Sequence, residues 1–252
     1  EEVIIPEGVK TIGPYAFANL TARAATGRKK TVFLRGYYHG NQPWAMKADY
    51  PGILPEEVAN NIVVPWFDIP ALERAWDYAK GDVPALIAQP YDHGNFFDNR
   101  CATPEYWAAV REFCTKHGIV LIIDDVRAGF RLDLQGSDHY YGFKADIICF
   151  CKALANGYNV SALCGKDFLK NTVSSLSYPG SYWLSAVPFA AGIACIEKMK
   201  KLDTPKLFRQ LGTELTGPEY AGRFIAQVEE LGIEYNDYEG KFNYEYFKGH
   251  IA

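Results

Sequence analysis

The sequence predicts a three-layer α/β fold, in which helices cover both faces of a mainly parallel β-sheet. Two kinds of segment predict it. Short apolar runs bounded by Gly, Pro or Asp are typical of strands, and they alternate along the chain with longer amphipathic runs of helical period. Most of the short runs are apolar throughout, so we expect both faces of the sheet to be buried. With 252 residues, 48% of them hydrophobic, the chain is long enough to form such a core.

The predicted strands are the short apolar runs, several of them rich in Val and Ile, and the predicted helices lie between and after them. The clearest helix is 103–117, where Thr103 is placed to cap the amino end, Pro104 occupies the first helical position, and Gly118 follows the last turn. The strands are expected at 31–36, 61–66, 84–90, 118–126, 145–151 and 160–165. The other helices are expected at 69–80, 186–201, 205–216 and 219–231.

Composition excludes several classes of function. The chain has 26 basic and 30 acidic residues and a net charge of −4, with neither sign gathered in a block, so we expect no nucleic-acid partner. No apolar run approaches the roughly 18 residues of a membrane span, and no signal peptide is evident, which favours a cytoplasmic protein with no membrane partner. The six cysteines form no CxxC pair, so we expect no metal site and a reducing compartment.

Two predicted strands end in polar residues that are unusual at such positions. Asp124 and Asp125 close one apolar strand, and Lys152 directly follows the next. Each has an ordinary explanation. An acid at a strand end can cap the next turn, and the side chain of a lysine there can simply extend into solvent. Together, at adjacent strand ends, a carboxylate and a lysine suit pyridoxal phosphate chemistry: the lysine amine forms the imine, and the carboxylate keeps the pyridine nitrogen protonated.

The block from Leu121 to Lys166 resembles the corresponding block of class III, fold-type I aminotransferases, particularly those similar to glutamate-1-semialdehyde aminomutase. The resemblance implies that Asp124 holds the pyridine nitrogen, Val126 packs against the cofactor ring, and Lys152 is the Schiff-base lysine. Asp125 stands where the family usually has a glutamate. The cofactor implied is pyridoxal 5′-phosphate, with an amino donor and a carbonyl acceptor as substrates.

Two further segments carry the resemblance. In GRKKTVFLRGYYHGN (27–41), Tyr38 falls on the aromatic residue that stacks over the cofactor ring, and His39 completes the match. In GSYWLSAVPFAAG (180–192), Ser181 falls on the residue whose hydroxyl binds the cofactor phosphate, which in the family comes from the neighbouring subunit. The family therefore implies a homodimer with a shared active site.

The chain also departs from the family. Gln89 replaces the acid of the family's Glu-Pro strand end, and the phosphate-binding Ser-Gly-Thr loop is missing near Pro14, a residue without the N–H that a phosphate cradle uses. Residues 2–20 instead resemble a single leucine-rich repeat of bacterial surface proteins. We expect three parts: this repeat-like segment (1–20), a cofactor-binding large domain (21–202) and an incomplete C-terminal small domain (203–252).

These observations favour a pyridoxal-phosphate-dependent aminotransferase or aminomutase. The loop from Ala155 to Tyr158, after the lysine, resembles the transaminase-like members of the family more than the true aminomutases. Two alternatives remain open: a non-catalytic remnant of such an enzyme, or a Mg²⁺-dependent phosphoryl transferase that uses the Asp-Asp strand end. The second requires a phosphate loop, and Gly165-Lys166 lacks the spacing for one.

Overall fold

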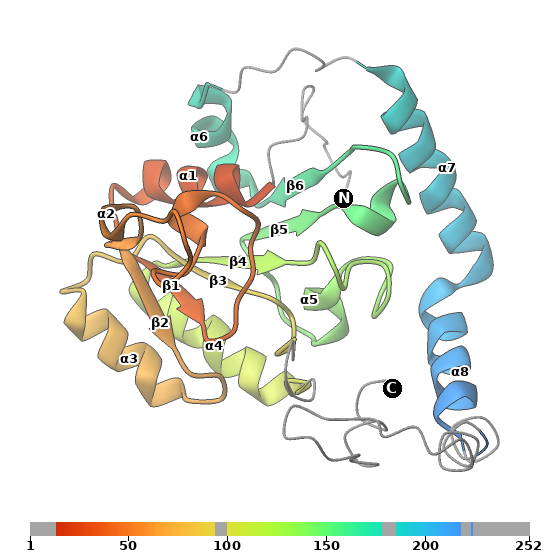
Figure 1. The fold of residues 1–252 in the computed structure, drawn as a ribbon, viewed down its shortest axis with the longest axis horizontal. Helices are drawn as coiled ribbons and strands as arrows, with labels where there is room; N and C mark the ends of the chain where they lie inside the picture. The colour runs from red at the N-terminus through yellow and green to blue at the C-terminus, as the bar shows by residue number, and fades with distance from the viewer. Residues whose placement is uncertain (1–13, 94–99, 178–184, 218–222, 224–252) are drawn as a thin grey trace.

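The predicted α/β fold is confirmed in the computed structural model, which describes residues 14–93, 100–177, 185–217 and 223 (Figure 1). Six strands form one sheet in the order β2-β1-β3-β4-β5-β6. Neighbours in the first five positions are parallel, and β6 runs antiparallel to β5. Every strand lies within a predicted run and is shorter than it: β1 (Thr31–Leu34), β2 (Asn61–Val64), β3 (Ala85–Ala88), β4 (Val120–Asp124), β5 (Ile147–Phe150) and β6 (Ala162–Gly165).

Successive side chains of the central strands point to opposite faces, and each face has its own hydrophobic core. One core joins the sheet to α3 (Ile69–Tyr78) and α4 (Pro104–His117), with Trp107 and Leu72 almost fully buried. The other joins it to α1 (Pro14–Thr26), through Ala18 and Ala22. Figure 1 shows α1 on one side of the sheet and α3 and α4 on the other, which explains why the strands are apolar throughout.

Helix α4 begins and ends as predicted. Thr103 Oγ1 accepts a hydrogen bond of 3.2 Å from the backbone N–H of Tyr106, and Gly118 ends the helix in the left-handed conformation (φ 61°). In α3, Asp68 caps the amino end by accepting from the N–H of Ala71 at 2.9 Å. Arg28 links the segments that precede β3 and β4. Its Nη1 donates hydrogen bonds of 3.0–3.1 Å to the carbonyl oxygens of Val83, His117 and Gly118.

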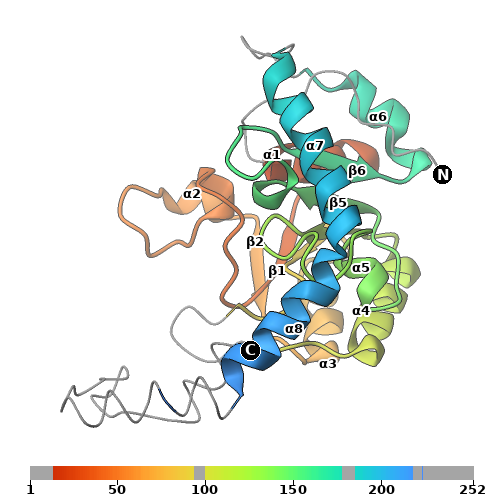
Figure 2. The same ribbon diagram turned by 90° about the vertical axis from the view of Figure 1, so that its right-hand side faces the viewer.

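The carboxy-terminal helices lie on the side of the sheet at which β4 and β5 end, as Figure 1 shows. Helix α7 (Ala186–Leu202) packs Phe189, Ile196 and Met199 against a third apolar cluster that includes Phe130 and Phe150. Helix α8 (Thr204–Thr216) follows after Asp203, and Figure 2 shows α7 passing in front of β5 and β6. Both match predicted helices, whereas the predicted helix 219–231 lies outside the described residues, apart from residue 223.

Helix α1 contains the carboxy-terminal part of the repeat-like segment. Phe17 of this segment is half-buried in the helix, and residues 2–13 lie outside the described residues. The proposed boundary at residue 20 falls within α1, so the division into three parts stays a prediction. No helix among the described residues is long and apolar enough to cross a membrane.

Several short elements were not predicted because a single helical turn has too few residues to show a period. They are η1 (Pro43–Ala45), α2 (Pro55–Val58), α5 (Ser137–Tyr140), η2 (Lys152–Leu154), η3 (Asp167–Leu169) and α6 (Lys170–Ser175). Of the cysteines, Cys114 and Cys149 are buried as small core residues, Cys151 is half-buried and Cys101 is exposed.

Candidate active site

The predicted polar residues lie at the carboxyl edge of the parallel sheet, where ligands bind in folds of this type. Asp124 is the last residue of β4. It pairs in register with Cys149 of β5, and Lys152 follows Cys149 by three residues on the adjacent strand end. The spacing of 28 residues between Asp124 and Lys152 is therefore spanned by one turn, the short helix α5 and strand β5.

Asp124 is paired with His39, which comes from the segment after β1. The His39 Nδ1 and Asp124 Oδ2 atoms are 2.6 Å apart, and the two residues are only 1% and 4% exposed. The imidazole ring stacks near Tyr37, with ring centroids 5.6 Å apart, and Phe33 lies against both rings. This aromatic packing fixes the orientation of His39, and His39 in turn orients the carboxylate.

The turn after β4 holds the carboxylate from its other side. Asp124 Oδ1 accepts a hydrogen bond of 3.2 Å from the N–H of Val126, which packs against the core on the α1 face.

Asp125 points away from the site and accepts hydrogen bonds from both the N–H (2.8 Å) and the hydroxyl of Ser137. Burial raises the pKa of Asp125 to about 7, since desolvation disfavours its charged form. Adjacent acids thus have separate tasks: Asp124 faces the site and Asp125 anchors the turn.

Lys152 has an unusual backbone conformation. Its φ of 36° lies in the left-handed region, which is uncommon for a residue with a side chain and costs conformational energy. The short helix η2 holds it there, because the N–H of Asn156 donates to the Lys152 carbonyl at 2.9 Å and Leu154 and Ala155 are buried in the third cluster. The side chain of Lys152 is exposed, so its amine is accessible.

Tyr38 lies next to His39 and has an accessible ring, 52% exposed. Its hydroxyl donates to Asn41 Oδ1 at 3.1 Å, and its backbone carbonyl accepts from Gln89 Nε2 at 3.4 Å. Gln89, the residue that replaces the family's acid, therefore ties the end of β3 to the segment that carries Tyr38 and His39.

Sequence reasoning missed one residue of this site, His93. It follows β3 and is 3% exposed, and electrostatic interactions link it to Arg127, Asp124, Lys152 and His39. Its only signal in the sequence is a histidine five residues after the end of β3, which is too weak to single it out. Ser181, and the residues before Pro14 where the family's phosphate loop is missing, lie outside the described residues.

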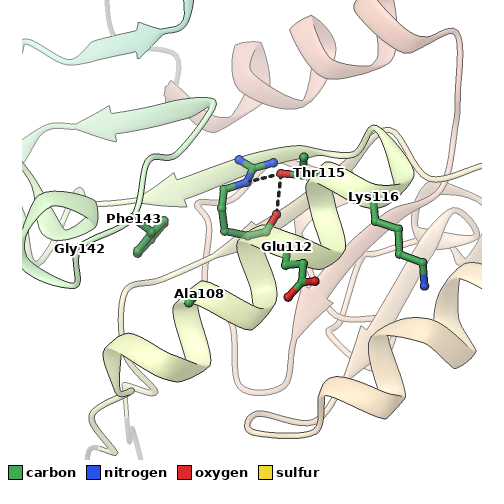
Figure 3. A pocket seen from close by; sticks show the side chains of 7 residues that line it. Ala108, Glu112, Thr115, Lys116, Gly142 and Phe143 are labelled. Atoms are coloured by element: carbon green, nitrogen blue, oxygen red, sulfur yellow. Dashed lines mark hydrogen bonds between the residues drawn. The ribbon is translucent and has the colours of Figure 1, made fainter.

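A pocket at the opposite edge of the sheet does not involve these residues. Figure 3 shows that α4 forms most of it, from Ala108 to Lys116, with Gly142 and Phe143 opposite. These residues precede β4 and β5, so they lie toward the amino ends of the strands. Arg111 Nε donates to Thr115 Oγ1 at 3.2 Å across the helix surface. The candidate site is therefore the carboxyl edge, and this pocket is separate from it.

The Asp-Asp strand end does not form a Mg²⁺ site in this arrangement. All four carboxylate oxygens of Asp124 and Asp125 take part in hydrogen bonds to protein groups, and the two side chains have different partners. Among the described residues, no group of three His, Cys, Asp or Glu side chains is placed to hold a metal.

A family model described as aminotransferase class-III matches residues 10–217, most of the chain. The chain belongs to the class III aminotransferases. This match supports the resemblance seen in the sequence, and it begins within the segment that resembles a leucine-rich repeat.

Similar class III proteins include an aminopentol aminotransferase from Sphingopyxis macrogoltabida, 36% identical over 217 residues, covering 86% of this chain and 50% of that protein. A 3-aminobutyryl-CoA aminotransferase from Cloacimonas acidaminovorans (strain Evry) is 29% identical, covering 85% and 50%. Among solved structures, the FumI protein of Sphingopyxis sp. MTA144, determined with PLP, has a TM-score of 0.76 and 32% identity, covering 85% and 53%. The chain thus spans about half the length of these relatives.

Proposed function

We propose that the chain binds pyridoxal 5′-phosphate and transfers an amino group between an amine donor and a carbonyl acceptor. The observation that carries this proposal is the arrangement at the carboxyl edge, where the buried His39–Asp124 pair lies one strand from the accessible amine of Lys152. Membership of the class III aminotransferases supports it, as does the solved relative that holds PLP.

The residues present fit this cofactor chemically. When bound, pyridoxal phosphate supplies a ring that accepts electrons from the substrate carbon. Asp124 carries the acid that can hold a proton on a ring nitrogen, and it is buried, which strengthens such an interaction. His39 fixes that acid on Oδ2, while the N–H of Val126 fixes Oδ1. The accessible ring of Tyr38 beside His39 supplies an aromatic surface for stacking.

Lys152 has two tasks in the proposed reaction. Its Nζ atom is the amine that binds the cofactor, and it then carries a proton to and from the substrate carbon once the amine substrate has taken its place. Both tasks need an amine that can leave and return, which the exposed side chain and the short helix η2 allow. Arginine could not replace it, because the guanidinium remains charged and forms no imine.

Transfer between two molecules is favoured over migration within one. The loop Ala155-Asn156-Gly157-Tyr158 resembles the transaminase-like members of the family, and both curated relatives described above are named aminotransferases. The aminomutase alternative predicts one product from one substrate, without a separate acceptor.

We also propose a homodimer, in which Ser181 of one subunit completes the phosphate site of the other. Equilibrium sedimentation tests the dimer.

The test is a panel of amine donors, including aminopentol and alanine, incubated with the chain, pyridoxal phosphate and pyruvate. We expect pyruvate to be consumed in the presence of at least one donor. Where alanine is the donor, another keto acid replaces pyruvate as the acceptor, and we expect pyruvate to be formed. Lys152→Ala should abolish this turnover, while Lys170→Ala, which removes an exposed lysine in α6, should retain it. A wild-type chain that binds the cofactor weakly or not at all, and converts no donor, would support the remnant alternative.

A further inference from the structure

His93 is a buried histidine whose ring nitrogens are both without hydrogen-bond partners among the described residues. It is 3% exposed, and the Tyr91 ring packs against it with centroids 4.2 Å apart. A buried polar group without a partner is costly, so native structures seldom retain one unless a water, an ion or a ligand satisfies it. His93 therefore requires an explanation from outside the described part of the chain.

The surroundings of His93 place it in the candidate active site. The charged and titratable groups that act on its ring are Arg127, Asp124, Lys152 and His39. Three of these are the residues of the proposed cofactor site, and Arg127 is on the turn that follows Asp124. His93 itself follows β3, the strand next to β4 on the side away from β5, so it approaches the site from the flank opposite Lys152.

The imidazole of His93 is neutral at physiological pH. Burial, together with the positive charge of Arg127, lowers its pKa to about 4, although Asp124 acts in the other direction. A neutral ring has one N–H donor and one acceptor nitrogen. With the cationic side chain of Arg127 acting on the ring, the donor lies where negative charge on a ligand is stabilised.

We propose that His93 donates a hydrogen bond to a negatively charged oxygen of the molecule bound between Asp124 and Lys152. This proposal rests on the proposed function, since it takes that molecule to be the cofactor alone or with an amine substrate. Two sources supply such an oxygen: a ring oxygen of pyridoxal phosphate, or the carboxylate of an amino-acid donor. In either case the bound molecule gives the imidazole N–H a partner that none of the described residues supplies.

The first measurement is the stability of the chain without cofactor. His93→Leu replaces an unpartnered imidazole with an apolar side chain of similar size, so we expect the urea midpoint of unfolding to stay the same or rise. His139→Gln is the control, because His139 is an exposed histidine of α5 with its own partner, Asp133. A lower midpoint for His93→Leu than for the control would show that the ring serves packing, and would overturn the proposal.

The second measurement is ligand binding by the same variants. If the oxygen belongs to the cofactor, His93→Leu should weaken the binding of pyridoxal phosphate about tenfold and shift its absorbance band, as expected for one lost charge-assisted hydrogen bond. If the oxygen belongs to the donor, cofactor binding should be unchanged. The half-saturating concentration of alanine should then rise about tenfold, while that of isopropylamine, which has no carboxylate, should not.

The variant His93→Gln separates hydrogen bonding from shape, since its amide also donates. We expect it to recover most of the affinity that His93→Leu loses. Unchanged affinity for pyridoxal phosphate and for alanine in His93→Leu would overturn this proposal alone. A wild-type chain that fails to bind pyridoxal phosphate would overturn the proposed function as well, so the two failures are distinguishable.

Discussion

His39 and Asp124, 85 residues apart in sequence, form a buried pair with 2.6 Å between Nδ1 and Oδ2. The parallel sheet brings them together, because β1 and β4 both pair with β3 and all three strands end at the same edge. Aromatic packing by Phe33 and Tyr37 holds the imidazole, so the carboxylate has a fixed orientation before any ligand binds. Preorganisation of this kind is what a charge-stabilising group in a catalytic site requires.

Replacing the carboxylate of Asp124 by an amide tests its charge. Asp124→Asn keeps the size of the side chain but removes the negative charge, so we expect amine-dependent turnover to fall at least about 100-fold. The measurement is the single-turnover rate of the cofactor-loaded chain with a saturating donor. Asp133→Asn, on a half-buried acid paired with exposed His139, is the matched control and should keep the wild-type rate. Equal rates for the two variants would remove Asp124 from the mechanism.

Asp125 predicts a pH dependence of stability. Its pKa in the folded chain is raised by burial from the ordinary 3.8 to about 7, so between these values the folded state holds a proton that the unfolded state releases. Its contribution to stability therefore falls as pH rises from about 4 to 7, by up to about 1.4 kcal/mol per pH unit, and then levels off. Urea unfolding at pH 5, 6, 7 and 8 should show this slope reduced in Asp125→Asn. The same slope in both chains would contradict the assignment.

Gly129 closes the turn that carries Val126 and Arg127. A Cβ at this position would lie 2.5 Å from the Asp125 carbonyl oxygen and 2.8 Å from Phe150 Cδ1. We therefore expect Gly129→Ala to lower the free energy of unfolding by about 2 kcal/mol or more and to weaken cofactor binding, since the backbone must shift. Gly212→Ala in α8 meets no atom within 4 Å and should stabilise the chain slightly. Similar effects of the two substitutions would show that the turn tolerates a side chain.

Much of the fold could be predicted from the sequence because the strands are continuous apolar runs and helix α4 has unambiguous capping residues. Each strand is shorter than its predicted run. Asp124 and Lys152 could be placed at one edge because parallel strands end together. The contact of His39 with Asp124 could not be derived, since hydrogen bonding between distant segments leaves no periodic signal. His93 was missed for the same reason.

The most direct test of the proposed site is to locate the bound cofactor on the chain. The chain is mixed with pyridoxal phosphate, the lysine adduct is reduced with borohydride, and the modified peptides are identified by mass spectrometry. We expect modification predominantly of the peptide that contains Lys152, and its loss from that peptide in the Lys152→Ala chain. Modification spread over exposed lysines such as Lys170, without preference for Lys152, would contradict the assignment of the active site.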